Sequence, residues 1–310
     1  MLVFTFPGQG SQRPGMGAPW IDHPSWELVT DASEAVDRDV AALLLDAGQE
    51  ELTQTRNAQL ACFTLSMVVL DAIERTGLAP VAAAGHSLGE YSALVAAGAL
   101  GFADALRLVR RRGQLMQEAV PVGQGAMAAI IGLDPEAIAG IATESAQGEI
   151  CAVANFNGPS QTVIAGSKGA VDRAVVLARE RGARKATLLA VSAPFHSPLM
   201  RPAREGMAPL LAATAFEDPR LPVVSNVDAA PVASGETARD ALVRQIDSPV
   251  RWVESISWME EALGVEVFVE VGPGNVLSGL NRRIVKAARS TAVTDPDHLR
   301  QLLEETEEES

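Results

Sequence analysis

The residues best suited to chemistry lie in the segment AAAGHSLGEYSA, residues 82–93, where glycines stand two positions before and after Ser87. A strand of small residues precedes this serine and a helical pattern follows it, as in the nucleophile elbow of serine enzymes. Gly85 and Gly89 allow a turn too tight for Cβ atoms, with the Ser87 hydroxyl exposed at the positive end of a helix. The pattern favours Ser87 as a nucleophile, and the alternative is a serine that only caps the helix.

A serine nucleophile needs a general base. Of the four histidines, His196 in VSAPFHSPLM directly follows a predicted strand, which places it at the sheet edge where α/β sites assemble. A Ser–Asp–His order would need an aspartate between Ser87 and His196, in a loop after a strand of the large domain. No aspartate in that interval has this position, so we expect a group other than a carboxylate to orient His196.

The helix predicted over 102–119 carries an arginine where its periodicity requires an apolar residue. Arg112 lies at the centre of the apolar stripe, and a buried guanidinium is costly unless it meets an anion. Two explanations stay open: an internal partner such as Glu90, or a ligand carboxylate held by the planar fork of the guanidinium. Gly113 permits the close approach of another backbone segment, and Ser87 and Arg112 on successive helices could face one cleft.

These residues must be positioned by an α/β fold, because predicted strands alternate with helical patterns almost throughout. Residues 126–191 follow the order β-α-β-β-α-β of a ferredoxin-like domain, and the α/β pattern resumes after them. We therefore expect a large domain with a mostly parallel sheet, residues 1–123 and 193–310, and an inserted ferredoxin-like domain, residues 124–192. The last helix is predicted over 275–288, and the acidic segment 304–310 is expected to be frayed.

Composition excludes several classes of function. The 310 residues carry a formal net charge of −14, which disfavours nucleic acid and anionic membranes as partners. No apolar run is long enough to span a membrane, and the N-terminal segment lacks the basic start of a signal peptide. The two cysteines, Cys62 and Cys151, lie in apolar runs without metal-ligand spacing, which is typical of buried thiols in a cytoplasmic protein.

Several collinear motifs resemble one enzyme family. The chain resembles the malonyl-CoA:acyl carrier protein transacylases, which load malonyl groups for fatty acid synthesis, and the related acyltransferase domains of polyketide synthases. The resemblance spans nearly the whole chain and rests on FPGQGSQ at 6–12, AGHSLGEYSALVAAG at 84–98, RGQLMQEAVP at 112–121, GAMAAIIGL at 125–133, NFNGP at 155–159, FHSPLM at 195–200, VRQIDSPVRW at 243–252 and EVGPGNVLSGL at 270–280. It implies a hydrolase-like large domain beside the ferredoxin-like one.

The resemblance also implies roles for single residues. Ser87 would be the nucleophile and His196 the base, while Arg112 would bind the malonyl carboxylate. The backbone amides of Gln9 and Leu88 would form the oxyanion hole.

Two further roles follow from the same resemblance. The main-chain carbonyl of Gln245 would orient the histidine, which would account for the missing aspartate. Phe195 before His196 is similar to the malonyl-type signature, although Ala193-Pro194 before it departs from that signature and Phe195 could also have a plain packing role.

The implied reaction is ping-pong transfer of a malonyl group from malonyl-CoA to the phosphopantetheine thiol of an acyl carrier protein, without a bound cofactor or metal, by a monomer. The alternatives are a serine hydrolase (a thioesterase or esterase), a free-standing acyltransferase that serves a polyketide synthase, and a silent module that binds a carrier protein. Because carrier proteins are acidic, we expect a local basic patch, with ordinary surface charge as the alternative. Its candidates are Arg184 and Lys185 on the small domain and Arg282, Arg283, Lys286 and Arg289 on the helix after GPGN.

Overall fold

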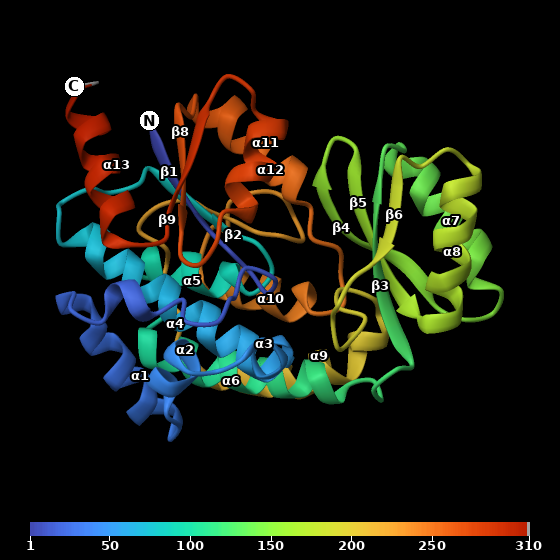
Figure 1. The fold of residues 1–310 in the computed structure, drawn as a ribbon, viewed down its shortest axis with the longest axis horizontal. Coiled ribbons are helices and arrows are strands. Elements are labelled where there is room, and N and C mark those ends of the chain that lie inside the picture. The colour runs from blue at the N-terminus through green and yellow to red at the C-terminus, as the bar shows by residue number, and fades with distance from the viewer. Residues whose placement is uncertain (309–310) are drawn as a thin grey trace.

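The computed structural model describes residues 1–308, which form two separate sheets (Figure 1). Sheet A is parallel throughout, with the strand order β7-β2-β1-β8-β9. Its strands are β1 (Leu2–Phe6), β2 (Ala82–Gly85), β7 (Val223–Val224), β8 (Val267–Val271) and β9 (Arg289–Val293). A parallel sheet needs helices on both faces, and this one has them.

Alternate residues of β1 face the two layers of helices, as the pleat of a strand requires. Phe4 and Phe6 pack in the main core, while Val3 packs with Trp252 and Leu277 on the opposite face. The helices of the large domain are α1 (Glu27–Val36), α2 (Val40–Leu45), α3 (Gln49–Thr53), α4 (Thr55–Glu74), α5 (Gly89–Ala96), α6 (Phe102–Glu118), α9 (Arg201–Ala213), α10 (Gly235–Gln245), α11 (Trp252–Leu263), α12 (Val276–Ile284) and α13 (Pro296–Glu308), with short 3-10 turns at Ala18–Trp20, Pro24–Trp26 and Pro198–Met200.

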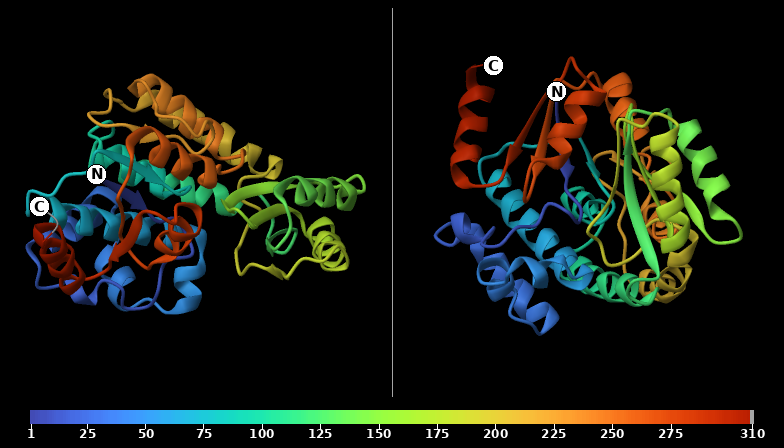
Figure 2. Two further views of the ribbon diagram at one scale, coloured as in Figure 1. Left: turned by 90° about the horizontal axis from the view of Figure 1, so that it is seen from above. Right: turned by 45° about the vertical axis from the view of Figure 1, so that its right-hand side comes forward.

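Sheet B is antiparallel and confirms the ferredoxin-like prediction. Its strand order is β4-β5-β3-β6, which places the first and third strands of the β-α-β-β-α-β unit in the centre. The unit comprises β3 (Gly125–Ile131), α7 (Pro135–Ala146), β4 (Cys151–Gly158), β5 (Gln161–Ser167), α8 (Lys168–Glu180) and β6 (Lys185–Leu188). It stands at one end of the molecule (Figure 2), and we propose that residues 124–192 are an inserted domain.

The region after α12 differs from the sequence prediction. Helix α12 ends at Ile284, and the chain then forms β9 and helix α13, which continues to Glu308. Residues 304–308 belong to the last turns of α13, whose earlier residues Leu299 and Leu302 pack in the main core, and the frayed end stays a prediction. Residues 309–310 of the acidic segment lie outside the described residues. Within residues 1–308, no helix is both long and apolar enough to cross a membrane.

Candidate active site

Ser87 stands at the tip of a sharp turn between β2 and α5, at the carboxyl edge of sheet A. Its φ is 54°, a left-handed conformation that is strained for a residue with a side chain. A Cβ atom on Gly85 would lie 1.8 Å from the carbonyl carbon of Gly89, and one on Gly89 would lie 2.0 Å from the carbonyl oxygen of Phe6. Both glycines are therefore required by the close approach of β1, β2 and α5.

His196 is the partner of Ser87, as predicted. Ser87 Oγ lies 2.7 Å from His196 Nε2, and His196 Nδ1 lies 2.9 Å from the carbonyl oxygen of Gln245 and 3.2 Å from that of Ser248. Carbonyl oxygens only accept hydrogen bonds, so the proton of a neutral ring resides on Nδ1 and Nε2 is free to accept from the serine hydroxyl. Main-chain carbonyls thus hold the histidine in the position where a Ser-His-Asp triad has a carboxylate.

The site keeps His196 uncharged. The residue is only 3% exposed and also has a positive φ of 56°. Burial, followed by the nearby charge of Arg112, lowers the pKa of His196 to about 3. A neutral imidazole is the form that can accept a proton from Ser87.

Arg112 reaches the same point from α6, where it is 1% exposed. Its Nη1 donates to Gln59 Oε1 at 2.8 Å, and its Nη2 donates to Ser87 Oγ at 3.1 Å and to Gln245 Oε1 at 2.9 Å. All three acceptors are uncharged oxygens, and Nε has no acceptor among the described residues. The guanidinium also lies over the ring of Tyr91, 5.7 Å from its centroid.

Glu90, one of the two anions considered for Arg112, makes no hydrogen bond to the guanidinium within residues 1–308. Glu90 Oε2 instead accepts from Gln245 Nε2 at 2.6 Å. The predicted close approach at Gly113 is confirmed, because a Cβ there would lie 2.9 Å from the Cα of Arg56 on α4.

Ser87, His196 and Arg112 line a cavity of about 180 Å³ between the carboxyl edge of sheet A and sheet B. Gln9, Leu88 and Phe195 line it as well, so the structure brings together the residues predicted for the nucleophile, the base, the oxyanion hole and the carboxylate clamp. Gln245 adjoins the cavity through its bonds to His196 and Arg112. Three residues of α12 complete one wall: Val276, Leu277 and Leu280.

Sequence reasoning missed several polar residues of the site. Asn226 braces the elbow, because its Oδ1 accepts from the Ser87 amide at 2.7 Å and its Nδ2 donates to the Gly85 carbonyl at 2.7 Å. Asn157 on β4 forms a hydrogen bond with the ring of His86, with Oδ1 2.8 Å from Nε2, and both residues line the cavity. The available signal for Asn226 was its position two residues after β7, at the sheet edge where α/β sites assemble.

The candidate basic residues lie on and just after α12, and on β6 and the turn before it. Arg283 on α12 donates to Gln161 Oε1 at 3.0 Å, and Gln161 and Lys185 both pair with Ile131 across sheet B. Arg184, Lys185, Arg282, Arg283 and Lys286 are exposed. The prediction that Lys286 and Arg289 lie on the helix after GPGN is wrong, because α12 ends at Ile284. Lys286 lies in the loop after α12, and Arg289 lies in β9 and forms an ion pair with Glu305.

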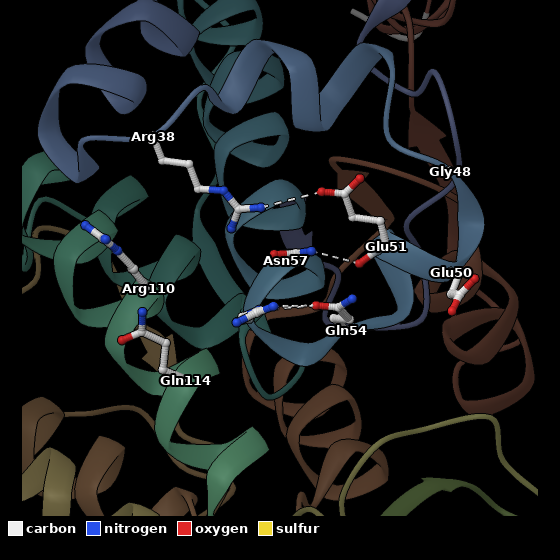
Figure 3. Close-up of a pocket in the computed structure, with 9 residues that line it drawn as sticks. Arg38, Gly48, Glu50, Glu51, Gln54, Asn57, Arg110 and Gln114 are labelled. Atoms are coloured by element: carbon white, nitrogen blue, oxygen red, sulfur yellow. Dashed lines mark hydrogen bonds and ion pairs between the residues drawn. The ribbon is translucent and has the colours of Figure 1, made fainter. Parts of the chain in front are cut away.

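A larger cavity, of about 610 Å³, lies elsewhere on the large domain (Figure 3). Neither a serine nor a histidine lines it. The three arginines of this cavity already have protein partners. Arg56 donates to Gln54 Oε1, and Arg110 donates to the carbonyl of Val36. Arg38 Nη2 lies 3.9 Å from Glu51 Oε1 (Figure 3). This cavity therefore lacks the groups for acyl transfer.

Known proteins resemble this chain over its whole length. The sequence model of the acyl transferase domain family matches residues 3–299. The malonyl CoA-acyl carrier protein transacylase of Escherichia coli (strain K12) is 48% identical over 306 residues, which cover 98% of this chain and 99% of that protein. An acyl carrier protein S-malonyltransferase from Vibrio cholerae has a TM-score of 0.93 at 47% identity, covering 97% of this chain and 99% of its own.

A further solved structure holds a malonyl-transacylase in complex with a type II polyketide synthase acyl-carrier protein. It has a TM-score of 0.95 at 46% identity and covers 98% of this chain and 99% of its own. The chain described here therefore belongs to the acyl transferase family, of which the malonyl CoA-acyl carrier protein transacylases are members.

Proposed function

We propose that this protein transfers the malonyl group of malonyl-CoA to the phosphopantetheine thiol of an acyl carrier protein, through a malonyl ester on Ser87. The observation that carries the proposal is the buried guanidinium of Arg112, which lies 3.1 Å from the Ser87 hydroxyl and has no carboxylate hydrogen-bond partner within residues 1–308. A substrate with a free carboxylate next to its reacting carbonyl would supply that partner. The names of the relatives with high identity support the same reaction.

In the first half-reaction, His196 Nε2 takes the proton of Ser87 while Oγ attacks the thioester carbonyl carbon. The backbone amides of Gln9 and Leu88 donate to the oxygen that becomes negative, and loss of one such donor typically costs on the order of 100-fold or more in rate. The carbon–sulfur bond then breaks, and the CoA thiolate takes the proton from His196. The products are CoA and malonyl-Ser87.

In the second half-reaction, the carrier thiol gives its proton to His196 and its sulfur attacks the ester carbonyl of malonyl-Ser87. The ester carbon–oxygen bond breaks, and Ser87 recovers its proton from His196. This sequence produces ping-pong kinetics and needs no bound cofactor. No cluster of histidine, cysteine or acidic side chains in residues 1–308 has the arrangement of a metal site.

The acyl group is selected by Arg112 and the apolar wall beside it. A malonyl carboxylate would replace neutral oxygens as the acceptor of the guanidinium and form charge-assisted hydrogen bonds. A neutral acyl chain would leave the buried guanidinium without an anion, so it is disfavoured. Phe195, which is buried against the cavity, would limit bulk at the α-carbon of the acyl group.

Two kinds of carrier protein fit this chemistry. The sequence motifs imply a carrier protein of fatty acid synthesis as the acceptor. A relative solved in complex with a type II polyketide synthase carrier protein supports a polyketide carrier as the second candidate acceptor. We propose that the exposed arginines and lysines Arg184, Lys185, Arg282 and Arg283 form the docking patch. Their support is their position around α12 and the adjoining rim of sheet B, next to the cavity that α12 lines.

The decisive experiment weighs the covalent adduct. The protein is incubated with a mixture of acyl-CoAs, and intact mass spectrometry identifies the adduct before and after addition of a holo carrier protein. We expect a malonyl adduct that is stable in water, discharges to the carrier, and is lost in Ser87→Ala. Rapid discharge to water without a carrier would identify a hydrolase instead, and no adduct would leave only a carrier-binding module.

We further propose a monomer that acts in the cytoplasm. All groups of the proposed mechanism come from one chain, so no second subunit is needed to complete the site. Both cysteines are unpaired, as is typical of a reducing compartment. Light scattering after size-exclusion chromatography tests the first part, and a dimer mass would contradict it.

A further inference from the structure

Glu90 is a buried carboxylate one helical turn after Ser87, and the mechanism above gives it no part. It is 1% exposed, and its Oε2 accepts from Gln245 Nε2 at 2.6 Å and from the Asn226 amide at 3.2 Å. Burial raises the pKa of Glu90 to about 7, although both hydrogen bonds favour its charged form. A buried carboxylate is costly to keep, so its contacts deserve a functional explanation.

The side chain of Gln245 is held in one orientation by these contacts. Its Nε2 donates to Glu90 Oε2 and to the Ser87 carbonyl at 2.8 Å, which uses both of its hydrogens. Its Oε1 is therefore turned to Arg112 Nη2, at 2.9 Å. A flipped amide would set its oxygen against two acceptors and its NH2 group against a donor, so Glu90 helps to fix which end faces the guanidinium.

The amide also keeps the carboxylate of Glu90 off the guanidinium. A carboxylate in direct contact would occupy the fork of Arg112 with charge-assisted bonds, and a substrate carboxylate would have to displace it. Neutral amide oxygens from Gln59 and Gln245 hold the guanidinium more weakly and remain exchangeable for an anion. The guanidinium is thus fixed in place without being neutralised by a bound anion.

We propose that Glu90 is a positioning residue that acts through the side-chain amide of Gln245 to hold Arg112 ready for a substrate carboxylate. It thereby sets the preference for carboxylated over neutral acyl groups. This inference rests on the proposed function, since it deepens the role given there to Arg112.

The test compares two variants of similar volume. Glu90→Gln keeps an oxygen acceptor for Gln245, whereas Glu90→Met removes it. The readout is the ratio of kcat/KM for malonyl-CoA to kcat/KM for acetyl-CoA, because any damage to the elbow or to His196 affects both substrates and cancels. We expect Glu90→Met to lower this ratio by roughly tenfold, as for loss of one buried hydrogen bond, and Glu90→Gln to lower it by less than about threefold.

Asn226→Ala is the control for damage to the elbow, because Asn226 contacts Ser87 and Glu90 but makes no hydrogen bond to Arg112 in residues 1–308. Its Oδ1 also lies 3.5 Å from Gln245 Nε2, but that nitrogen keeps its shorter bonds to Glu90 and the Ser87 carbonyl in this variant. It is expected to slow both substrates by a similar factor. In a Gln245→Leu background, which retains the main-chain carbonyl that holds His196, Glu90→Met is expected to leave the ratio unchanged. A further fall in the ratio there would overturn the action through Gln245.

If Glu90→Met does not fold, Glu90→Asp replaces it. The shorter side chain keeps the charge but withdraws the acceptor from Gln245, so the same fall in the ratio is expected. An unchanged ratio in whichever folded variant is used would overturn the inference while the wild-type protein still transfers malonyl. A wild-type protein that forms no malonyl adduct would instead overturn the proposed function.

Discussion

Arg112 Nη2 and Ser87 Oγ are 3.1 Å apart, although 25 positions separate the two residues in the chain. The contact joins the elbow turn to helix α6, and both residues line one cavity. In the proposed reaction, a short acyl group with a terminal carboxylate would place its carbonyl at the serine and its carboxylate at the arginine. The first prediction tests that geometry.

Arg112→Ala should lower kcat/KM for malonyl-CoA by roughly 100-fold, which corresponds to loss of a buried charge-assisted pair. Transfer of acetyl, which has no carboxylate, should fall far less. Steady-state rates with the two acyl-CoAs measure the difference, and Arg111→Ala on the exposed face of α6 is the control. Equal losses for both substrates would remove Arg112 from the role of carboxylate clamp.

Gly89→Ala should destabilise the fold and disable Ser87 together. The new Cβ would lie 2.0 Å from the Phe6 carbonyl oxygen, so the elbow must move away from β1, at a cost of roughly 1–3 kcal/mol or more. Urea unfolding and adduct formation are the measurements. Gly140→Ala on α7 is the matched control, because its Cβ meets no atom within 4 Å and should stabilise the helix slightly. Comparable stability of the two variants would contradict the packing argument.

His196 should make the protein sensitive to acid. Burial lowers its pKa from 6.5 to about 3, so the unfolded chain binds the proton more readily than the folded protein. The stability that depends on neutral His196 is complete above about pH 6.5 and is lost as the pH falls toward 3. Between pH 7 and pH 5, the free energy of unfolding should fall by about 2 kcal/mol more in the wild type than in His196→Asn. Parallel pH profiles for the two proteins would refute the lowered pKa.

The basic patch should affect the carrier half-reaction alone. Reversal of Arg282 and Arg283 to Glu should raise the KM for the carrier protein several-fold and weaken its dependence on salt. Acylation of Ser87 by malonyl-CoA should keep its rate. The control reverses Arg107 and Arg111 on α6, which changes the net charge equally at another place. An unchanged carrier KM would assign these arginines to ordinary surface charge.

Much of the fold could be predicted because its signals are local. Parallel strands buried on both faces read as short apolar runs, and the ferredoxin-like unit has a compact strand–helix order that periodicity reveals. The region after α12 was mispredicted because its local sequence signals are weak. Strand β9 (RSTAV) contains a single large apolar residue, Val293, and so lacks the apolar run of the other strands. The acidic residues of α13 suggest a solvated end, whereas Leu299 and Leu302 pack in the main core.

By itself, the sequence determined where the strained turn lies, which face of α6 carries a buried arginine, and that no aspartate follows a strand of the large domain between Ser87 and His196. These features depend on neighbours within a few residues, so spacing and residue type are enough to define them. Only the tertiary structure decided which groups bind His196, Arg112 and Ser87. The carbonyl of Gln245 meets His196, its amide meets Arg112, and Asn226 reaches Ser87 from 139 positions away. Periodicity states that a face is buried but not against what, because partners so far apart in the chain are set by packing of the whole core.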